Sequence, residues 1–396
     1  MKILREFALF TLACAGAAAG QPSYTVTPLP GPGSPIYMVD WISPDATRMI
    51  GYAFYPWGTP DAPNITIGQC YVYNNGTFTI LATTGFSCEP GRANSKGEFV
   101  GNLILSSQTD SKWYAFGYLN GDFVPLRSVL PDQPNMSFAT GINDKSEVVG
   151  WAWTSPVTVD SSGYPIVVYE VQYGFVYSNG QVRRLPTLGG HMSLASAINN
   201  SGDVAGGASD ASTPTVPFYS AETQHAVIFH GDQIIDISPP GAVASTAKLI
   251  NNKGQAAVIA QPKADSYLWT EGYFYDGAEL SPIPKLPGTV GPFTLIAMND
   301  SGELIGTQQT ADGLDHPFYY FNGRSYDLNQ ILENAPDGII LSYATTIDNA
   351  GRILASARRV GDPTMNAIGM FLLTPVPQAA SQASGRSPQR GIIPHR

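Results

Sequence analysis

A hairpin-like stretch that recurs seven times constrains the fold of this chain more than any other feature. The clearest copy is AINNSGDVAGGAS (residues 197–209), in which two apolar segments flank an Asn-Asn-Ser-Gly turn. Asn tolerates left-handed backbone angles and Gly adopts positive φ without steric cost, so the stretch predicts two strands joined by a tight turn. The copies are ISPDATRMIG ending at Gly51, ANSKGEFVG at Gly101, INDKSEVVG at Gly150, INNSGDVAG at Gly206, INNKGQAAV at Val258, MNDSGELIG at Gly306 and IDNAGRILA at Ala355.

The copies recur at a nearly constant spacing. The steps between their final residues are 50, 49, 56, 52, 48 and 49 residues, a period typical of a propeller or a similar array. Each unit also contains a second, aromatic-rich hairpin, such as YGFVYSNGQVRRL (173–185) or HPFYYFNGRSYDL (316–328). Two hairpins give four short strands, which is the make-up of a β-propeller blade.

We therefore predict an all-β fold, a seven-bladed β-propeller of four-stranded antiparallel blades. The last unit lacks a fourth strand after residues 367–376, whereas YTVTPLP (24–30) precedes the first hairpin and has no partner there. The N-terminal strand is expected to complete the last blade, which would leave no open sheet edge. Residues 21–376 would then form one propeller domain.

Residue sizes differ between the predicted strands of each unit. The first strand, for example residues 193–198, is rich in Ala and Ser, which suits the crowded centre of a propeller. The third and fourth strands carry large side chains that should fill the wider spaces between blades, at about 1.5–3 kcal/mol for each one buried. These are Phe116, Tyr118, Phe175, Tyr177, Ile228, Phe274, Phe318 and Tyr320. The recurrent Asn, Gly and aromatic positions are thus interpreted as structural.

The repeat resembles a known family. The INxxGxVVG hairpin, the HAF-like start of the third strand at residues 225–227, 114–116 and 316–318, and RRLPTLGGHMSLASAIN (183–199) are similar to the HAF-type extracellular repeats of bacteria. The first unit departs from the pattern at Ser43 and Pro44, and the fifth has Val258 in place of Gly. The resemblance implies a propeller-like array outside the cell and brings no catalytic residues with it.

The N-terminal residues predict where the protein is located, and the net charge restricts its partners. Residues 1–20 combine Lys2 and Arg5 with an apolar stretch and a small-residue site, which predicts a secretory signal peptide and an extracellular protein. A periplasmic protein or a lipoprotein anchored through Cys14 is less favoured. No other apolar run is long enough to predict a transmembrane segment. A net charge of −10 argues against nucleic acid as a partner. Residues 377–396 lack periodicity and are predicted to be disordered.

Two cysteines remain after the predicted signal peptide, Cys70 and Cys88. An even number in an exported protein favours a disulfide. The repeat places Cys70 at the start of a third strand and Cys88 at the start of the next unit's first strand, so two free thiols remain the alternative.

The sequence contains no familiar catalytic, phosphate-binding or metal-binding motif, and we expect no cofactor and no metal. Acidic turn residues such as Asp144, Asp203, Asp300 and Glu303 are interpreted as solvated rather than as calcium ligands. Among predicted first strands, Asp40 and Glu89 are candidates for carboxylates facing the axis, and Arg92 could pair with either.

Blade-specific loops offer a candidate binding surface. The connection between second and third strands is long in units one, three and four, and insertions on one face commonly create a binding site. Aromatic residues in and beside these loops are candidate ligand contacts, with capping of the spaces between blades as the simpler alternative. They are Tyr55, Trp57, Trp153, Tyr164, Tyr169, Phe218 and Tyr219.

Two functions follow. The favoured one is a secreted, non-catalytic repeat protein that binds a protein or glycan partner through one propeller face. The alternative is a secreted carbohydrate-active hydrolase or lyase, which would need at least two carboxylates in one pocket on the axis.

Overall fold

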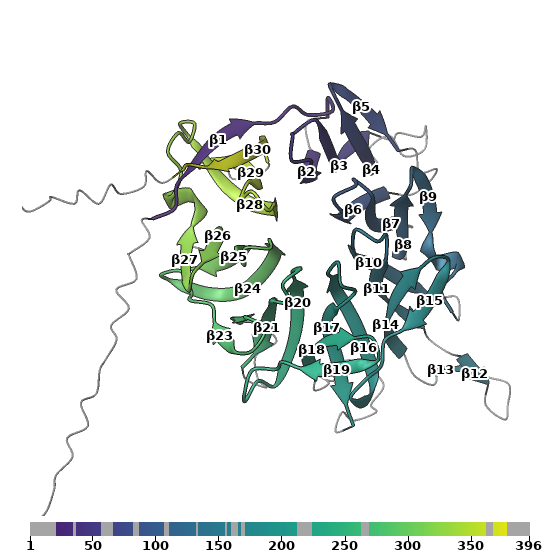
Figure 1. The fold of residues 1–396 in the computed structure, drawn as a ribbon. Coiled ribbons are helices and arrows are strands. Elements are labelled where there is room, and N and C mark those ends of the chain that lie inside the picture. The colour runs from purple at the N-terminus through teal and green to yellow at the C-terminus, as the bar shows by residue number, and fades with distance from the viewer. Residues whose placement is uncertain are drawn as a thin grey trace, which may run out of the picture.

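The fold is a ring of antiparallel sheets around a central axis (Figure 1). The computed structural model describes residues 21–34, 37–56, 66–81, 87–106, 111–131, 134–154, 157–159, 165–167, 171–211, 224–262, 269–311, 313–361 and 367–377. The predicted signal peptide and most of the predicted tail lie outside these residues. No helix in the described segments has the length and hydropathy needed to cross a bilayer.

The described residues form seven four-stranded sheets, so the predicted propeller is confirmed. Each sheet is one blade, numbered from the N-terminus. Blade 1 contains β2 (Tyr37–Ile42), β3 (Arg48–Pro56), β4 (Thr66–Asn74) and β5 (Thr77–Ile80). Blade 2 contains β6 (Ser87–Ala93), β7 (Phe99–Ser106), β8 (Ser111–Leu119) and β9 (Asp122–Pro125), followed by the 3₁₀ turn η1 (Leu126–Ser128). Blade 3 contains β10 (Met136–Ile142), β11 (Val148–Thr154), β14 (Val171–Ser178) and β15 (Gln181–Arg184).

The later blades repeat the same order. Blade 4 contains β16 (Gly189–Ile198), β17 (Val204–Asp210), β18 (Gln224–His230) and β19 (Gln233–Asp236). Blade 5 contains β20 (Ala244–Ile250), β21 (Ala256–Gln261), β22 (Glu271–Tyr275) and β23 (Leu280–Pro282). Blade 6 contains β24 (Thr289–Met298), β25 (Leu304–Thr310), β26 (Asp315–Phe321) and β27 (Arg324–Asp327), followed by the 3₁₀ turn η2 (Leu328–Gln330). Blade 7 contains β28 (Ile339–Ile347), β29 (Ile353–Arg359), β30 (Gly369–Pro375) and β1 (Tyr24–Pro28).

The ring is closed by the N-terminal strand, as the sequence predicts. β1 pairs antiparallel with β30, and Tyr24 lies opposite Pro375 (Figure 1). Tyr24 is buried and packs edge-on against Tyr319 of blade 6. The closing strand is therefore held by a sheet ladder on one side and by the neighbouring blade on the other.

The hydrophobic core is divided among the spaces between blades. Seven clusters of buried residues occur in the described chain, and each draws side chains from two neighbouring blades. Phe116, Phe175 and Phe318, which the sequence places in the core, are fully buried. Tyr118, Tyr177 and Phe274 are partly buried against the same clusters. Large residues on the middle strands therefore hold each blade to the next.

The anchor glycine of the repeat has a steric role. A Cβ on Gly150 would lie 1.9 Å from the carbonyl oxygen of Phe138, and one on Gly206 would lie 2.0 Å from that of Leu194. Real Cβ atoms do not approach backbone that closely, so the second strand can pass the innermost strand only with glycine there. Nothing in the structure explains how Val258 takes this position in blade 5.

The repeated Asn builds its own turn. In blade 3 the Asn143 side-chain oxygen accepts hydrogen bonds from the backbone N–H of Lys145 and Glu147, and its amide donates to the Glu147 carboxylate. The same amide also donates to the backbone carbonyl of Asn199 in blade 4, at 3.0 Å. One buried side chain thus shapes a hairpin and ties it to the next blade.

These links continue around the whole ring and form what we call the turn belt. Five turn residues donate forward to the equivalent carbonyl of the next blade, and these are Asn94, Asn143, Asn199, Asn251 and Asn299. Where the Asn pattern fails, arginines replace it. Arg352 of blade 7 donates to the Ser43 carbonyl, and Arg48 of blade 1 donates to the Lys96 carbonyl. The described turns therefore form a closed circle of seven links.

The acidic turn residues belong to this belt, so the interpretation that they are simply solvated is wrong. Asp144 accepts from the Ser95 backbone N–H and the Asn200 amide, which lie in the blades on either side. Asp300 likewise accepts from Asn252 and Asn349. Carboxylates bridging three blades in this way have a structural role.

A second recurrent contact joins the third and fourth strands. His225, the first residue of the HAF-like motif in blade 4, pairs with Asp236 at 2.9 Å, and His316 pairs with Asp327 at 2.9 Å in blade 6. Blade 5 uses Lys285 and Glu271 at a similar place. The motif histidine thus fastens the outer hairpin of its own blade.

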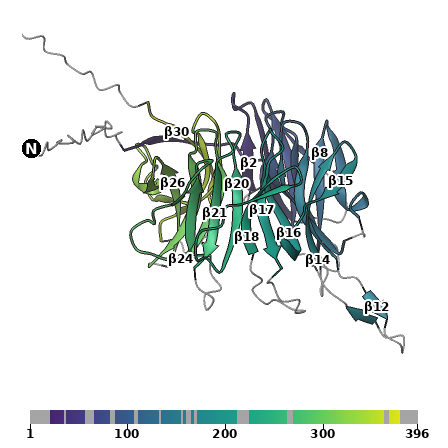
Figure 2. The same ribbon diagram turned by 60° about the horizontal axis from the view of Figure 1, so that its bottom comes forward.

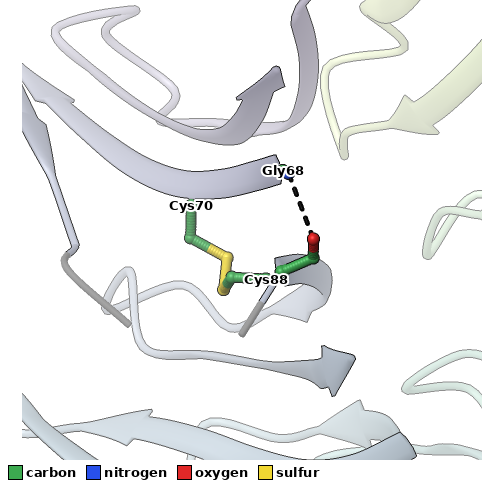
Figure 3. The surroundings of a disulfide bond; sticks show 4 residues. Gly68, Cys70 and Cys88 are labelled. Carbon is green, nitrogen blue, oxygen red and sulfur yellow. Dashed lines mark hydrogen bonds between the residues drawn. A yellow bond between two sulfur atoms is a disulfide. The ribbon is translucent and has the colours of Figure 1, made fainter. Parts of the chain in front are cut away.

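A disulfide joins blades 1 and 2. Cys70 on β4 and Cys88 on β6 are bonded, with their Cα atoms 5.3 Å apart (Figure 3). Beside the bond, the Gly68 backbone N–H donates to the Ser87 hydroxyl. Cys88 lies near the start of β6, as the repeat predicts, whereas Cys70 lies in the middle of β4, because that strand begins earlier, at Thr66.

The two faces of the disc carry different connections. In each blade, the turn between the first and second strands lies at the same face as the turn between the third and fourth strands. We call this the turn face. The second strands end and the third strands begin at the other face, the loop face, because neighbouring strands are antiparallel. The extra hairpin of β12 (Val157–Val159) and β13 (Pro165–Val167) projects from the loop face (Figure 2). The strand ends that flank the predicted insertions of blades 1, 3 and 4 thus lie on one side, whereas most residues of the insertions are outside the described residues.

Candidate functional site: the central channel

The innermost strand of every blade contains a β-bulge, and the bulges surround the axis at one level. The register shifts between Val39 and Trp41, Pro90 and Ala93, Ala139 and Gly141, Ala195 and Ala197, Ala247 and Leu249, Leu295 and Ala297, and Ala344 and Thr346. A bulge inserts an extra residue and re-aims its side chain. The inserted residues include Asp40, Arg92, Lys248 and Ile296.

Small polar residues at this level connect adjacent blades. The Thr140 hydroxyl donates to the Ala195 carbonyl of blade 4, and the Thr345 hydroxyl donates to the Val39 carbonyl of blade 1. Each contact joins a hydroxyl of one blade to a backbone carbonyl of the next blade.

Arg92 crosses the channel. Its guanidinium, from β6 in blade 2, donates to the backbone carbonyl of Ile296 on β24 in blade 6. Guanidinium keeps its positive charge under all ordinary conditions. The contact therefore fixes a cation near the axis of the ring.

Asp40 lies in the same electrostatic environment. Burial raises the pKa of its carboxyl to about 8, while Arg92 opposes the rise and Glu89 adds to it. Its Oδ2 atom is buried and has no hydrogen-bond partner among the described residues. Burial also raises the pKa of Glu89. The two candidate carboxylates and Arg92 are thus brought together, and Asp40 is largely protonated at neutral pH.

The sequence analysis missed three other members of the cluster. Burial lowers the pKa of the Lys248 ammonium, and Arg92 lowers it further. Burial raises the pKa of the Tyr343 phenol, and burial together with Asp40 and Glu89 raises that of Tyr52. Tyr343 nevertheless keeps 40% of its surface exposed. Their place in first or second strands was a possible signal, but the bulge decides which of them face the axis.

The turn-face end of the channel is hollow. A cavity of about 340 Å³ opens among the hairpin turns, and Arg92 is one of its lining residues. Apolar side chains such as Trp41 and Met298 share its wall with the turn amides. A small polar solute could thus reach the guanidinium from this face.

This arrangement has the components of acid–base chemistry. A protonated carboxyl at Asp40 can donate a proton, and a neighbouring carboxylate can accept one. In the described part of the chain, no three His, Cys, Asp or Glu side chains gather as metal ligands.

The predicted loop-face aromatics are only partly described. Tyr55 lies near the end of β3, is half-buried, and donates its hydroxyl to the Pro32 carbonyl at 3.3 Å. Trp153 lies near the end of β11 and is also half-buried. Trp57, Tyr164, Tyr169, Phe218 and Tyr219 lie outside the described residues.

An aromatic stack that sequence reasoning missed lies between blades 2 and 3. Phe138 stacks on Trp151 with ring centroids 4.2 Å apart and on Trp113 at 5.5 Å. All three rings are half-buried. The register places Trp153 opposite Met136, two residues beyond Trp151 on the same side of β11, so the stack leads toward the loop face. The alternation Trp151-Ala152-Trp153 was its sequence signal.

Comparison with known proteins supports the fold alone. The chain is similar to an acylaminoacyl peptidase solved with Z-Gly-Gly-Phe-chloromethyl ketone (TM-score 0.50, 10% identity, covering 86% of this chain and 52% of that one). It is also similar to the acylaminoacyl peptidase of Pyrococcus horikoshii (TM-score 0.51, 11% identity, 85% and 51% covered). The β-propeller domain of the Trilobed protease from Pyrococcus furiosus matches with a TM-score of 0.49 at 9% identity, covering 86% of this chain and 94% of that domain.

The chain spans about half the length of the two peptidases. No protein-family model matches it, and no curated protein does. The fold places the chain in the class of seven-bladed β-propellers.

Proposed function

We propose that the chain is an exported, non-catalytic propeller that binds a protein or glycan through its loop face. One observation supports the proposal: the inner hairpin turns of the turn face are joined in a closed belt, whereas the blade-specific hairpin of β12 and β13 projects from the loop face, where the second strands end. A rigid ring with variable loops on one side is a common design for recognition.

The aromatic side chains near the loop face favour a partner with apolar surface. The stack of Trp113, Phe138 and Trp151, extended by Trp153, offers large rings of the kind that dominate binding energy at interfaces. The predicted signal peptide and the similarity to HAF-type extracellular repeats support placing this surface outside the cell.

Loop replacement tests the proposal. Residues 57–65, 155–170 and 212–223 are each replaced by a short Gly-Ser linker, and wild type and variants are applied to arrays of glycans and purified envelope proteins. We expect at least one ligand whose binding is lost in a loop variant but kept in Asp232→Asn, a change to an exposed turn-face residue. Absence of any ligand above background, or equal binding by all variants, would contradict the proposal.

A carbohydrate-active hydrolase or lyase is the second candidate, and the meeting of Asp40 and Glu89 in the channel favours it. In this role protonated Asp40 is the general acid, and Glu89 is the base or nucleophile. The test incubates wild type, Asp40→Asn and Glu89→Gln with a panel of polysaccharides and measures new reducing ends and ultraviolet-absorbing products. Activity that both variants lose and Glu279→Gln retains supports this candidate, since Glu279 is exposed on an outer turn. Equal product from all four proteins contradicts it.

A further inference from the structure

Two cations approach each other in the channel from different blades. Lys248 and Ile296 are the bulge residues of neighbouring inner strands, β20 in blade 5 and β24 in blade 6. The Arg92 guanidinium donates a hydrogen bond to the Ile296 carbonyl. It therefore lies next to the bulge of the neighbouring inner strand, which carries Lys248. The cross-channel contact thus brings a positive charge from blade 2 close to one from blade 5.

The positive charge of this pair is not balanced by its surroundings. Within the described residues Lys248 makes no hydrogen bond and no ion pair, and its partial burial makes solvation incomplete. The nearby Asp40 carboxyl does not form an ion pair with either cation, since its buried Oδ2 atom has no hydrogen-bond partner among the described residues, and burial raises the pKa of the group. Tyr343 and Tyr52 are neutral phenols. The channel of a protein with net charge −10 therefore holds an excess of positive charge.

We propose that the channel binds a small anion, such as the carboxylate of an organic or sugar acid, between Arg92 and Lys248. Like charges in a poorly solvated space repel each other, and an anion between them replaces that repulsion with two attractive, charge-assisted contacts. The turn-face cavity of about 340 Å³ provides a route, since Arg92 lines it. The site lies on the axis, so it does not depend on a ligand at the loop face.

The shared chemistry of the ligand is an anionic oxygen group, and the probes separate its sources. Titration calorimetry is done with the full mature chain and sodium acetate, sodium sulfate, sodium D-glucuronate or uncharged D-glucose. We expect at least one anion to bind with one site per chain and to raise the melting temperature, with glucose inactive. Tighter binding of glucuronate than of acetate identifies a sugar acid, and tighter binding of acetate or sulfate identifies a simple anion.

The decisive variant is Lys248→Met, with Lys253→Met as its matched control. Lys253 lies in the same blade, five residues away, but is exposed on the turn. Loss of a charge-assisted contact should weaken anion binding about tenfold or more in Lys248→Met and leave it unchanged in Lys253→Met. Without added anion, Lys248→Met should melt at a higher temperature than wild type, because the repulsion is gone.

The proposal is overturned if no anion binds up to 100 mM, a test ceiling set at about the upper end of weak affinities. It is also overturned if Lys248→Met binds as well as wild type, or if glucose binds as well as glucuronate. Loss of loop-face binding in the loop variants leaves all of these readings unchanged, so the two proposals fail independently.

Discussion

The turn face and the loop face of this disc are built from the same hairpins, yet they are held together differently. At the turn face, buried amides and two arginines link every described blade to the next. Toward the loop face, the strongest described link is the disulfide between blades 1 and 2. Uniform sequence at one face maintains the ring, and this allows the other face to vary.

The largest expected effect comes from breaking the turn belt. Asn143→Ala removes four hydrogen bonds, and at roughly 1 kcal/mol each the free energy of unfolding should fall by about 4 kcal/mol. Urea denaturation monitored by tryptophan fluorescence measures the loss. The control is Asn135→Ala at the loop-face end of blade 3, an exposed residue whose replacement should have little effect. Equal stability of the two variants would show that the belt does not hold the ring.

Removing the disulfide is expected to have the next largest effect. Cys70 and Cys88 are separated by 18 residues, and a loop of that size corresponds to about 3 kcal/mol in the chain-entropy account. The double variant Cys70→Ser/Cys88→Ser should lose this amount while its turn-face contacts persist. A melting temperature that does not change with reductant in the wild type would count against the bond in solution.

The channel lies between the two faces and should make stability depend on pH. The pKa of Asp40 is about 8 in the folded chain, against 3.8 as the ordinary value, so the native state binds an extra proton between these limits. The contribution of protonated Asp40 to the free energy of unfolding is present in full below pH 3.8 and is lost as pH rises through 8. Between pH 5 and 9 wild type should lose about 2 kcal/mol relative to Asp40→Asn, allowing for channel water. Parallel stability curves for the two proteins would contradict this.

The smallest effect is expected at the outer edge of the turn face. Arg183 and Asp232 join blades 3 and 4 at 3.4 Å, but Asp232 is 94% exposed. Exposed pairs contribute little to stability, so Asp232→Asn should leave the melting temperature unchanged. A clear drop would mean that the outer turns share the role of the inner belt.

The fold could be predicted from sequence because its determinants are local and repeated. Asn, Gly and the spacing of the hairpins specified the blades, and the unpaired strand at residues 24–28 specified the closure. The belt itself was not predicted, because the two arginines that complete it stand where the motif breaks down. The repeat predicts contacts only where its Asn pattern holds, so it gave no information about the arginine contacts made where that pattern is absent.

The channel site was predicted only in part for a related reason. Asp40, Glu89 and Arg92 could be named because charged residues are rare in the inner strands. Lys248 is also a charged residue of an inner strand, so the same reasoning could have named it. Tyr343 lies in an equivalent strand beside a bulge, which disturbs the alternation of side chains, so its direction was not predictable. The reach of Arg92 from blade 2 to blade 6 is a tertiary contact that no local pattern encodes.

The direction of the belt limits how such a chain can gain or lose units during evolution. Every amide link runs from one turn to the following turn, so a duplicated internal unit would receive a bond from its predecessor and give one to its successor. The arginine links at Ser43 and Lys96 have no such interchangeability, since each fits only its own neighbour. Duplication of one of blades 3 to 6 would therefore preserve the hydrogen bonds of this rim. Duplication of blade 7 or blade 1, where the arginine links begin, would not preserve them.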